Sequence, residues 1–359
     1  MFLAILAAAL FGVSSPLAKL LLGNIEPILL AAFLYLGSGF GLLFIRSFHL
    51  FSISNEARVG RNDLPWLAGS ILTGGVAAPI ILFFSLRHTP AATASLLLNF
   101  EGVATALVAG LAFKEAIGKR IWLAIGTITG ASALLSLNIG GQWGLSLGAV
   151  GVLCACLLWG IDNNFTRNIS GKDPLTITMI KGLGAGAFSL VLAFVLHNPF
   201  PGMLTVFKAM LLGSVSYGAS IVLFILAMRN LGAARTSTLF GTAPFVGAVL
   251  SFLLFRESPG ALFAVSAPMM IVGAMLLLGE GHSHIHKHPF LQHEHRHRHD
   301  DEHHIHYHIS GEIPPNDYHS HLHTHEAIEH CHPHAPDIHH RHSHRKAKAM
   351  LSPNASVGR

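Results

Sequence analysis

The stretch Phe113-Lys114-Glu115-Ala116-Ile117-Gly118 closes a long apolar run. A stretch of the same design, Phe255-Arg256-Glu257-Ser258-Pro259-Gly260, closes another run 142 positions later. Residues upstream keep this register: Arg87, Ala91, Ala92 and Ser95 match Arg229, Ala233, Ala234 and Ser237. A further matching pair is Leu10-Phe11-Gly12-Val13 and Leu158-Trp159-Gly160-Ile161. The sequence therefore predicts two related halves built from apolar spans.

The composition indicates a membrane protein with a polar tail. The chain is 51% hydrophobic and 11% charged, with a mean hydropathy of +0.53, and much of the charge lies in short loops and after residue 280. Residues 1–280 lack the charged surface that a soluble domain needs. The net charge of +5 is spread thinly, with no basic block interleaved with aromatic residues, which argues against nucleic-acid binding.

A helix needs about 20 apolar residues to cross the hydrocarbon core. Ten runs meet this length approximately: 2–22, 27–45, 64–84, 90–112, 119–137, 144–166, 174–196, 204–226, 233–255 and 260–279. Backbone groups in lipid must be satisfied internally, and the alternation typical of barrel strands is absent, so the runs are expected to be helices. The predicted fold class is an all-α integral membrane protein with ten transmembrane helices.

The basic residues predict the orientation of these spans. Even-numbered loops hold most of them: Arg46, Arg58, Arg61, Lys114, Lys119, Arg120, Arg167, Lys172, Arg229 and Arg235. By the positive-inside rule both termini then face the cytoplasm, and the protein lies in the inner (plasma) membrane. Since each half has an odd number of spans, residues 1–138 and 139–280 would insert as inverted repeats, with residues 281–359 as a cytoplasmic tail. Inverted repeats are typical of secondary transporters, whose site lies between the repeats.

Five plus five spans, Trp159-Gly160, and the Phe-(Lys/Arg)-Glu ending of the fourth helix in each half together resemble the EamA family of the drug/metabolite transporter superfamily. The resemblance covers about residues 1–280. It implies a ten-helix inverted-repeat fold and transport of a small molecule, but names no substrate, because the family covers amino acids, nucleobases, drugs and other metabolites. One departure concerns the fourth helix: the second half has Pro244, whereas the first half has Glu101-Gly102 and no proline at the corresponding place.

Glu101 is a candidate coupling residue because ionisable groups inside spans are costly. It lies near the middle of its span, with Asn99 and Thr105 nearby, and its counterpart in the second half is Ala243. One interpretation is a carboxylate that binds a proton or a cation during transport. The alternative is a neutral carboxylic acid hydrogen-bonded between helices.

Asp162 and Lys181 are expected at the same depth of two antiparallel spans, because they lie nine and ten residues from a connector centred near Gly171. They would form an interhelical ion pair in a polar cluster that includes Asn163. Alternatively, Lys181 would meet an anionic group of the substrate and release Asp162 during the cycle.

Small residues mark one face of the Glu101 span in both halves: Ser95, Asn99, Gly102 and Ala106 match Ser237, Gly241, Pro244 and Ala248 in spacing. Such a face favours close helix packing over cavity lining, and Asn99 stays a candidate for either role. Trp159 is a candidate to line the substrate site, although aromatic residues in helices usually pack.

The tail holds 23 of the 26 histidines, alternating with other residues. We expect it to be disordered when free and to bind Zn²⁺, Ni²⁺, Co²⁺ or Cu²⁺ in many weak sites. The candidate ligands are His282, His284, His286, His288, His293, His295, His297, His299, His303, His304, His306, His308, His321, His323 and His325. The alternative is a solubilising or pH-responsive extension.

The favoured function is secondary-active transport of a small metabolite with a metal-binding regulatory tail. No catalytic constellation and no phosphate loop is present in the sequence, so we expect neither an enzyme nor an ATP-driven pump, and no required cofactor. The partners would be the lipid bilayer, a small solute and divalent transition metals, with a homodimer left open. The rivals are a transition-metal exporter and a membrane-anchored metal sensor or buffer.

Overall fold

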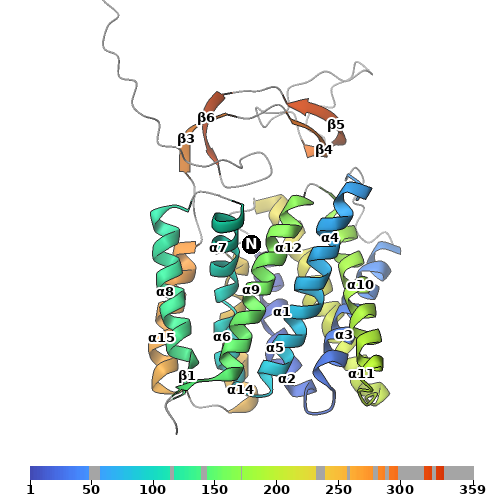
Figure 1. The fold of residues 1–359 in the computed structure, drawn as a ribbon, viewed down its shortest axis with the longest axis vertical. Coiled ribbons are helices and arrows are strands. Elements are labelled where there is room, and N and C mark those ends of the chain that lie inside the picture. The colour runs from blue at the N-terminus through green and yellow to red at the C-terminus, as the bar shows by residue number, and fades with distance from the viewer. Residues whose placement is uncertain are drawn as a thin grey trace, which may run out of the picture.

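The computed structural model describes the chain except residues 48–56, 114–116, 139–143, 171, 232–238, 257–258, 278–281, 288–290, 298–318, 326–328 and 335–359. Its main body is a bundle of helices that run side by side (Figure 1). The Lys114-Glu115-Ala116 and Glu257-Ser258 parts of the two repeated stretches lie outside the described residues.

The helices of residues 1–138 are α1 (Phe2–Gly12), α2 (Ser14–Leu21), α3 (Pro27–Ser47), η1 (Arg61–Asp63), α4 (Leu64–Ser70), η2 (Ile71–Ala77), α5 (Ala78–Leu86), α6 (Ala91–Leu97), α7 (Phe100–Ala112) and α8 (Lys119–Ser136). A short pair of strands, β1 (Leu137–Asn138) and β2 (Gly144–Leu145), leads to the rest of the bundle. There the helices are α9 (Leu147–Asn168), α10 (Pro174–Val195), α11 (Met203–Leu212), η3 (Gly213–Ala219), α12 (Ser220–Leu231), α14 (Ala243–Phe255) and α15 (Ala261–Leu277).

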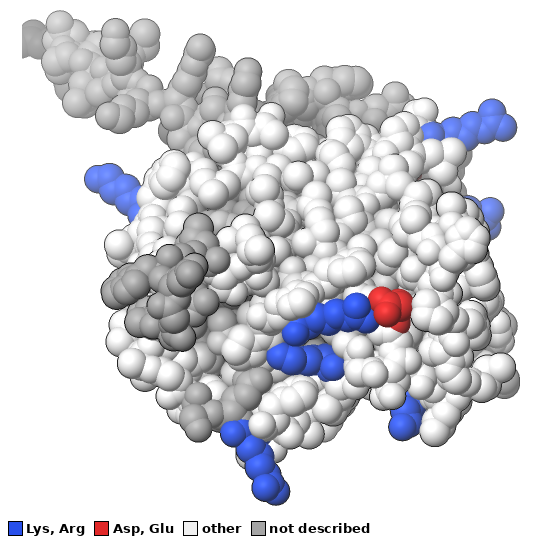
Figure 2. Space-filling view, turned by 60° about the horizontal axis from the view of Figure 1, so that its bottom comes forward, with Lys and Arg blue, Asp and Glu red and all other residues white. Residues whose placement is uncertain are grey.

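Within the described residues, seven helical segments are long and apolar enough to cross a membrane. They are Phe2–Leu21, Pro27–Ser47, Arg61–Leu86, Ala91–Ala112, Leu147–Asn168, Pro174–Val195 and Met203–Ile225. Two shorter apolar helices, α14 and α15, belong to the same bundle. Large apolar side chains are exposed on its outside, Leu111, Leu147 and Met203 among them, and few charged groups interrupt the surface seen in Figure 2. Such a surface suits lipid and not water.

Two π-helical turns lie in the same register as the repeated sequence. The bounds of η2 and η3 differ by 142 positions, the offset of the two terminal stretches. Each turn joins two α-helices of one continuous segment, α4 to α5 and α11 to α12. The fourth helix of each half is also interrupted, at turn residues 98–99 in the first half and 241–242 in the second. These are nearly equivalent positions of the repeat. π-Turns often mark functional sites.

Glycines allow the central helices to approach at backbone distance. A Cβ atom on Gly182 of α10 would lie 2.8 Å from the amide nitrogen of Gly39, and one on Gly186 would lie 2.6 Å from that of Leu36. On the other side of α3, a Cβ atom on Gly37 would overlap the carbonyl oxygen of Met210 in α11. Small residues at such crossings let helices pack closely in the absence of a hydrophobic driving force.

The described residues of the histidine-rich tail include four short strands. They are β3 (His282–Lys287), β4 (Leu291–His297), β5 (His319–His325) and β6 (Glu329–His334). In antiparallel register, β3 pairs with β6 and β4 with β5, and each pair sets three histidines opposite histidines. In these segments histidine alternates with a period of two, which is the period of a strand. That the tail is disordered when free stays a prediction. Isolated two-stranded pairs are marginally stable in water.

We predict that Gly37→Ala destabilises the bundle by about 1–3 kcal/mol, because the added methyl group overlaps the backbone of α11. The melting temperature of the purified protein in detergent checks this. Gly126→Ala in α8 is the matched control, since a Cβ atom there would meet nothing within 4 Å. Equal melting temperatures for the two variants would contradict the prediction.

Candidate functional site

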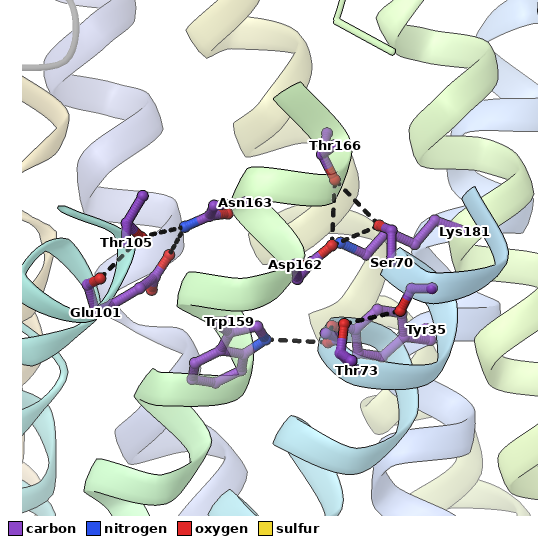
Figure 3. Close-up of polar contacts among 12 residues, drawn as sticks. Tyr35, Ser70, Thr73, Glu101, Thr105, Trp159, Asp162, Asn163, Thr166 and Lys181 are labelled. Carbon is purple, nitrogen blue, oxygen red and sulfur yellow. Dashed lines mark hydrogen bonds and ion pairs between the residues drawn. The ribbon is translucent and has the colours of Figure 1, made fainter. Parts of the chain in front are cut away.

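Two groups of polar side chains lie at mid-bundle on either side of α9 (Figure 3). In the first group, the Lys181 ammonium of α10 forms an ion pair with Oδ2 of Asp162. The hydroxyl of Ser70 donates to Oδ1, and that of Thr166 donates to the same oxygen over 3.1 Å. The predicted ion pair is therefore present, and each carboxylate oxygen has a partner.

The second group joins Glu101 of α7 to Asn163 of α9. The amide of Asn163 donates to Oε1 of Glu101 over 2.9 Å and to the hydroxyl of Thr105 over 3.1 Å. That hydroxyl also donates to the backbone carbonyl of Glu101. Glu101 is partly exposed and Asn163 is exposed, so this group is more accessible than the buried Asp162.

The carbonyl of Gly74 links three helices. It accepts a hydrogen bond of 2.7 Å from the hydroxyl of Tyr35 and one of 3.0 Å from the indole nitrogen of Trp159. Both donors come from other helices, α3 and α9, as Figure 3 shows.

The local sequence explains why this carbonyl is available. In η2 the amide of Ala78 bonds to the carbonyl of Thr73, five residues back. The same pattern would pair Gly74 with residue 79, which is proline and has no N–H group. An unpaired carbonyl in a bilayer costs several kcal/mol. The Tyr35 and Trp159 side chains remove that cost.

Gly74 is also needed for its missing side chain. A Cβ atom at this position would overlap the carboxylate of Asp162. The close approach of η2 to α9 therefore brings the ion pair and the two aromatic donors to the same turn.

Aromatic rings extend the site away from α9. The ring of Tyr35 lies 5.7 Å from that of Tyr217, which lies 5.7 Å from Phe11, and Phe11 lies 5.3 Å from Phe240. Tyr217 belongs to η3 and Tyr35 donates to Gly74 of η2, so the row connects the two π-helical turns. Its rings offer an apolar surface beside the polar groups.

Not every predicted residue joins this arrangement. The amide of Asn99 donates to the carbonyl of Leu96, at the break between α6 and α7, and among the described contacts it bonds to neither polar group. The small-residue face packs elsewhere: Ser95 lies against Gly247 of α14, and Gly102 lies against Leu277 of α15. Glu101 faces α9 instead, where Asn163 donates to it.

Sequence reasoning missed Ser70 and Gly74. Ser70 is fully buried and looks like any small residue of an apolar span. Gly74 carried a signal, since the pair Gly74-Gly75 precedes Pro79 inside one span. Glycine and proline together in a membrane helix indicate an interruption.

The described residues include no group of three or more His, Cys, Asp or Glu that could hold a metal ion. Among the predicted metal ligands, His288, His299, His303, His304, His306 and His308 lie outside the described residues. The others occupy backbone positions in β3, β4 and β5.

We predict that Tyr35→Phe and Trp159→Phe each cost about 1 kcal/mol of stability, the value of one hydrogen bond, and that the double variant costs more than the sum. The excess arises because the carbonyl of Gly74 is then left unpaired. Adding Pro79→Ala, which supplies an N–H group, should reduce that excess. The measurement is a double-mutant cycle, built from the melting temperatures of the single and double variants in detergent. The account would be contradicted if the double variant lost only the sum of the two single losses in stability, both with Pro79 and with Pro79→Ala.

Comparison with known proteins identifies the family. The model of the EamA-like transporter family matches residues 1–137 and 146–279. A protein of Methanothermobacter thermautotrophicus described as an uncharacterized transporter is 30% identical over 292 residues, which cover 77% of this chain and 85% of that protein. A solved crystal structure with 17% identity matches with a TM-score of 0.56 over 77% of this chain and 95% of the other, which supports the fold. The chain is therefore a multi-pass membrane protein of the EamA-like transporter family, which is not an enzyme family.

Proposed function

We propose that this transporter carries a small metabolite by alternating access between two inverted halves, residues 1–138 and 139–280. The observation that carries the proposal is the pair of polar groups around α9. They combine Ser70 and Glu101 from the first half with Asp162 and Lys181 from the second. A site shared by two halves changes its accessibility when one half rocks against the other.

The register of the two halves supports the inverted arrangement. The two π-helical turns repeat at 142 positions, and the fourth helix is interrupted in each half. The crossings also correspond: Gly12 of α1 lies against Ala243 of α14, and Gly160 of α9 lies against Ala104 of α7. Each half thus uses its first helix to contact the fourth helix of the other.

Glu101 is our candidate for proton coupling. Its Oε1 atom accepts from Asn163, and its partial exposure leaves the carboxylate accessible to a proton. A carboxylate that is charged in one step and neutral in another would link the proton gradient to solute movement.

We propose that the end of the bundle carrying the C-terminal end of α15 faces the cytoplasm, together with both termini, in the inner (plasma) membrane. Basic residues concentrate at this end. Arg120 of α8 donates to the carbonyls of Met275 and Leu276 there. Arg46, at the end of α3, lies 3.7 Å from Asp173 at the start of α10.

The tail is proposed to bind Zn²⁺, Ni²⁺, Co²⁺ or Cu²⁺ and to regulate transport. Its strand register, which sets histidine opposite histidine, supports this role, because neutral imidazole is a good ligand for these ions. Metal would also stabilise strand pairs that are marginal without it.

The test of coupling uses proteoliposomes with a panel of radiolabelled metabolites. We expect Glu101→Gln to lose accumulation driven by a proton gradient, by about tenfold or more, while solute exchange across the membrane persists. The matched control is Glu26→Gln. The Glu26 carboxylate forms an ion pair with the Arg87 guanidinium over 3.0 Å. Equal accumulation by both variants would remove Glu101 from the coupling step.

The test of the tail compares the full chain with one ending at Gly281. Metabolite flux should persist in both, but should respond to Zn²⁺ only in the full chain, with the response weakening below about pH 6 as histidine becomes protonated. Flux of metal and of no metabolite would favour the metal exporter. Metal binding without any flux would favour a sensor or buffer.

A further inference from the structure

The two members of the Lys181–Asp162 ion pair are held unequally. The side chain of Asp162 is 4% exposed and keeps the hydroxyls of Ser70 and Thr166 on Oδ1. If the lysine moved away, this carboxylate would still have two hydrogen bonds. Asp162 is therefore the fixed member.

Lys181 is the less constrained member. Its side chain is 19% exposed, and within the described part of the chain Oδ2 of Asp162 is the hydrogen-bond partner of its ammonium group. An ammonium group has three donors, so two can reach a ligand. The flexible stem of lysine allows it to exchange one carboxylate partner for another.

We infer that Lys181 binds a carboxylate group of the transported solute, which replaces Asp162 as its partner. This inference rests on the proposed transport function and names its substrate class, small organic monocarboxylates. A single ammonium group suits a single negative charge. The nearby carboxylates of Asp162 and Glu101 would oppose a doubly charged phosphate.

Charge balance in the site predicts that a proton moves together with the solute. The described site holds one ammonium group and two carboxyl groups, so a bound carboxylate adds a third acid. Burying the added negative charge without compensation is costly. A proton taken up with the solute, by Asp162 or Glu101, offsets that cost, so the carboxylate moves with a proton.

The rest of the solute should be apolar. Tyr35 and Trp159 direct their polar atoms to the carbonyl of Gly74, so that what their rings can offer a solute is apolar surface. In Figure 3 both rings lie beside the ion pair. A solute with an apolar or aromatic body and one carboxylate matches these surroundings better than a sugar does.

The test measures binding to the purified full-length protein in detergent by calorimetry. The probes are acetate, butyrate and 3-phenylpropionate, each beside its uncharged amide. We expect the wild type to bind 3-phenylpropionate and not its amide. Lys181→Met should weaken that binding about thirtyfold or more, since it removes the charged partner. Lys208→Met, at an exposed lysine of α11, is the matched control and should bind normally.

Asp162→Asn separates exchange from a structural role. Removing the competing carboxylate should tighten 3-phenylpropionate binding by about tenfold, because Lys181 is then free for the ligand. A purely structural ion pair predicts weaker binding or misfolding instead. If Lys181→Met does not fold, the double variant Asp162→Asn/Lys181→Gln, which removes both charges, should fold and lose acid binding.

Two results would overturn the inference: equal binding of the acids and their amides, or weaker acid binding in Asp162→Asn. Uptake of uncharged metabolites without binding of any acid in the panel would also overturn it, while leaving the metabolite transporter intact. Absence of flux for every metabolite would remove the proposed function and this inference together.

Discussion

The carbonyl of Gly74, which has no backbone donor within its own helix, is the constraint on which the centre of this protein depends. Pro79 removes the N–H group that would have bonded to it, and lipid offers no replacement. Tyr35 and Trp159 supply the missing donors from two other helices. Gly74 also lacks a side chain, which leaves room for the carboxylate of Asp162. One interrupted turn therefore brings α3, α9 and the ion pair to a common point.

Duplication explains the scaffold, and departures from it explain the site. The π-helical turns recur at 142 positions, but Pro79 has Ile221 as its counterpart, and Glu101 has Ala243. The second half therefore lacks both the proline that frees a carbonyl and the acid of α7. Helices of both halves frame the polar groups, yet the chemistry that distinguishes them is asymmetric.

Sequence patterns anticipated features with a simple geometric cause. Apolar runs predicted the positions of the helices, and equal depth in antiparallel spans predicted the pairing of Asp162 with Lys181. Asn99 was expected near Glu101, but neighbours in sequence point in different directions around a helix, and its amide bonds to Leu96. The roles of Gly74 and Ser70 depend on which helices cross there, and spacing within one span does not contain that information. In the tail, the alternation of histidine has the period of a strand, and the strand pairing seen there follows that period.

The contact of α3 with α10 has a consequence for how this protein can evolve. Gly39, Gly182 and Gly186 bring the two helices so close that an added Cβ atom at any of them would overlap the facing helix. Every base change that alters the meaning of a glycine codon introduces a larger residue or a stop, so single mutations cannot adjust this crossing gradually. We therefore expect sequence variation to concentrate in the side chains around α9 and to spare the crossing of α3 with α10.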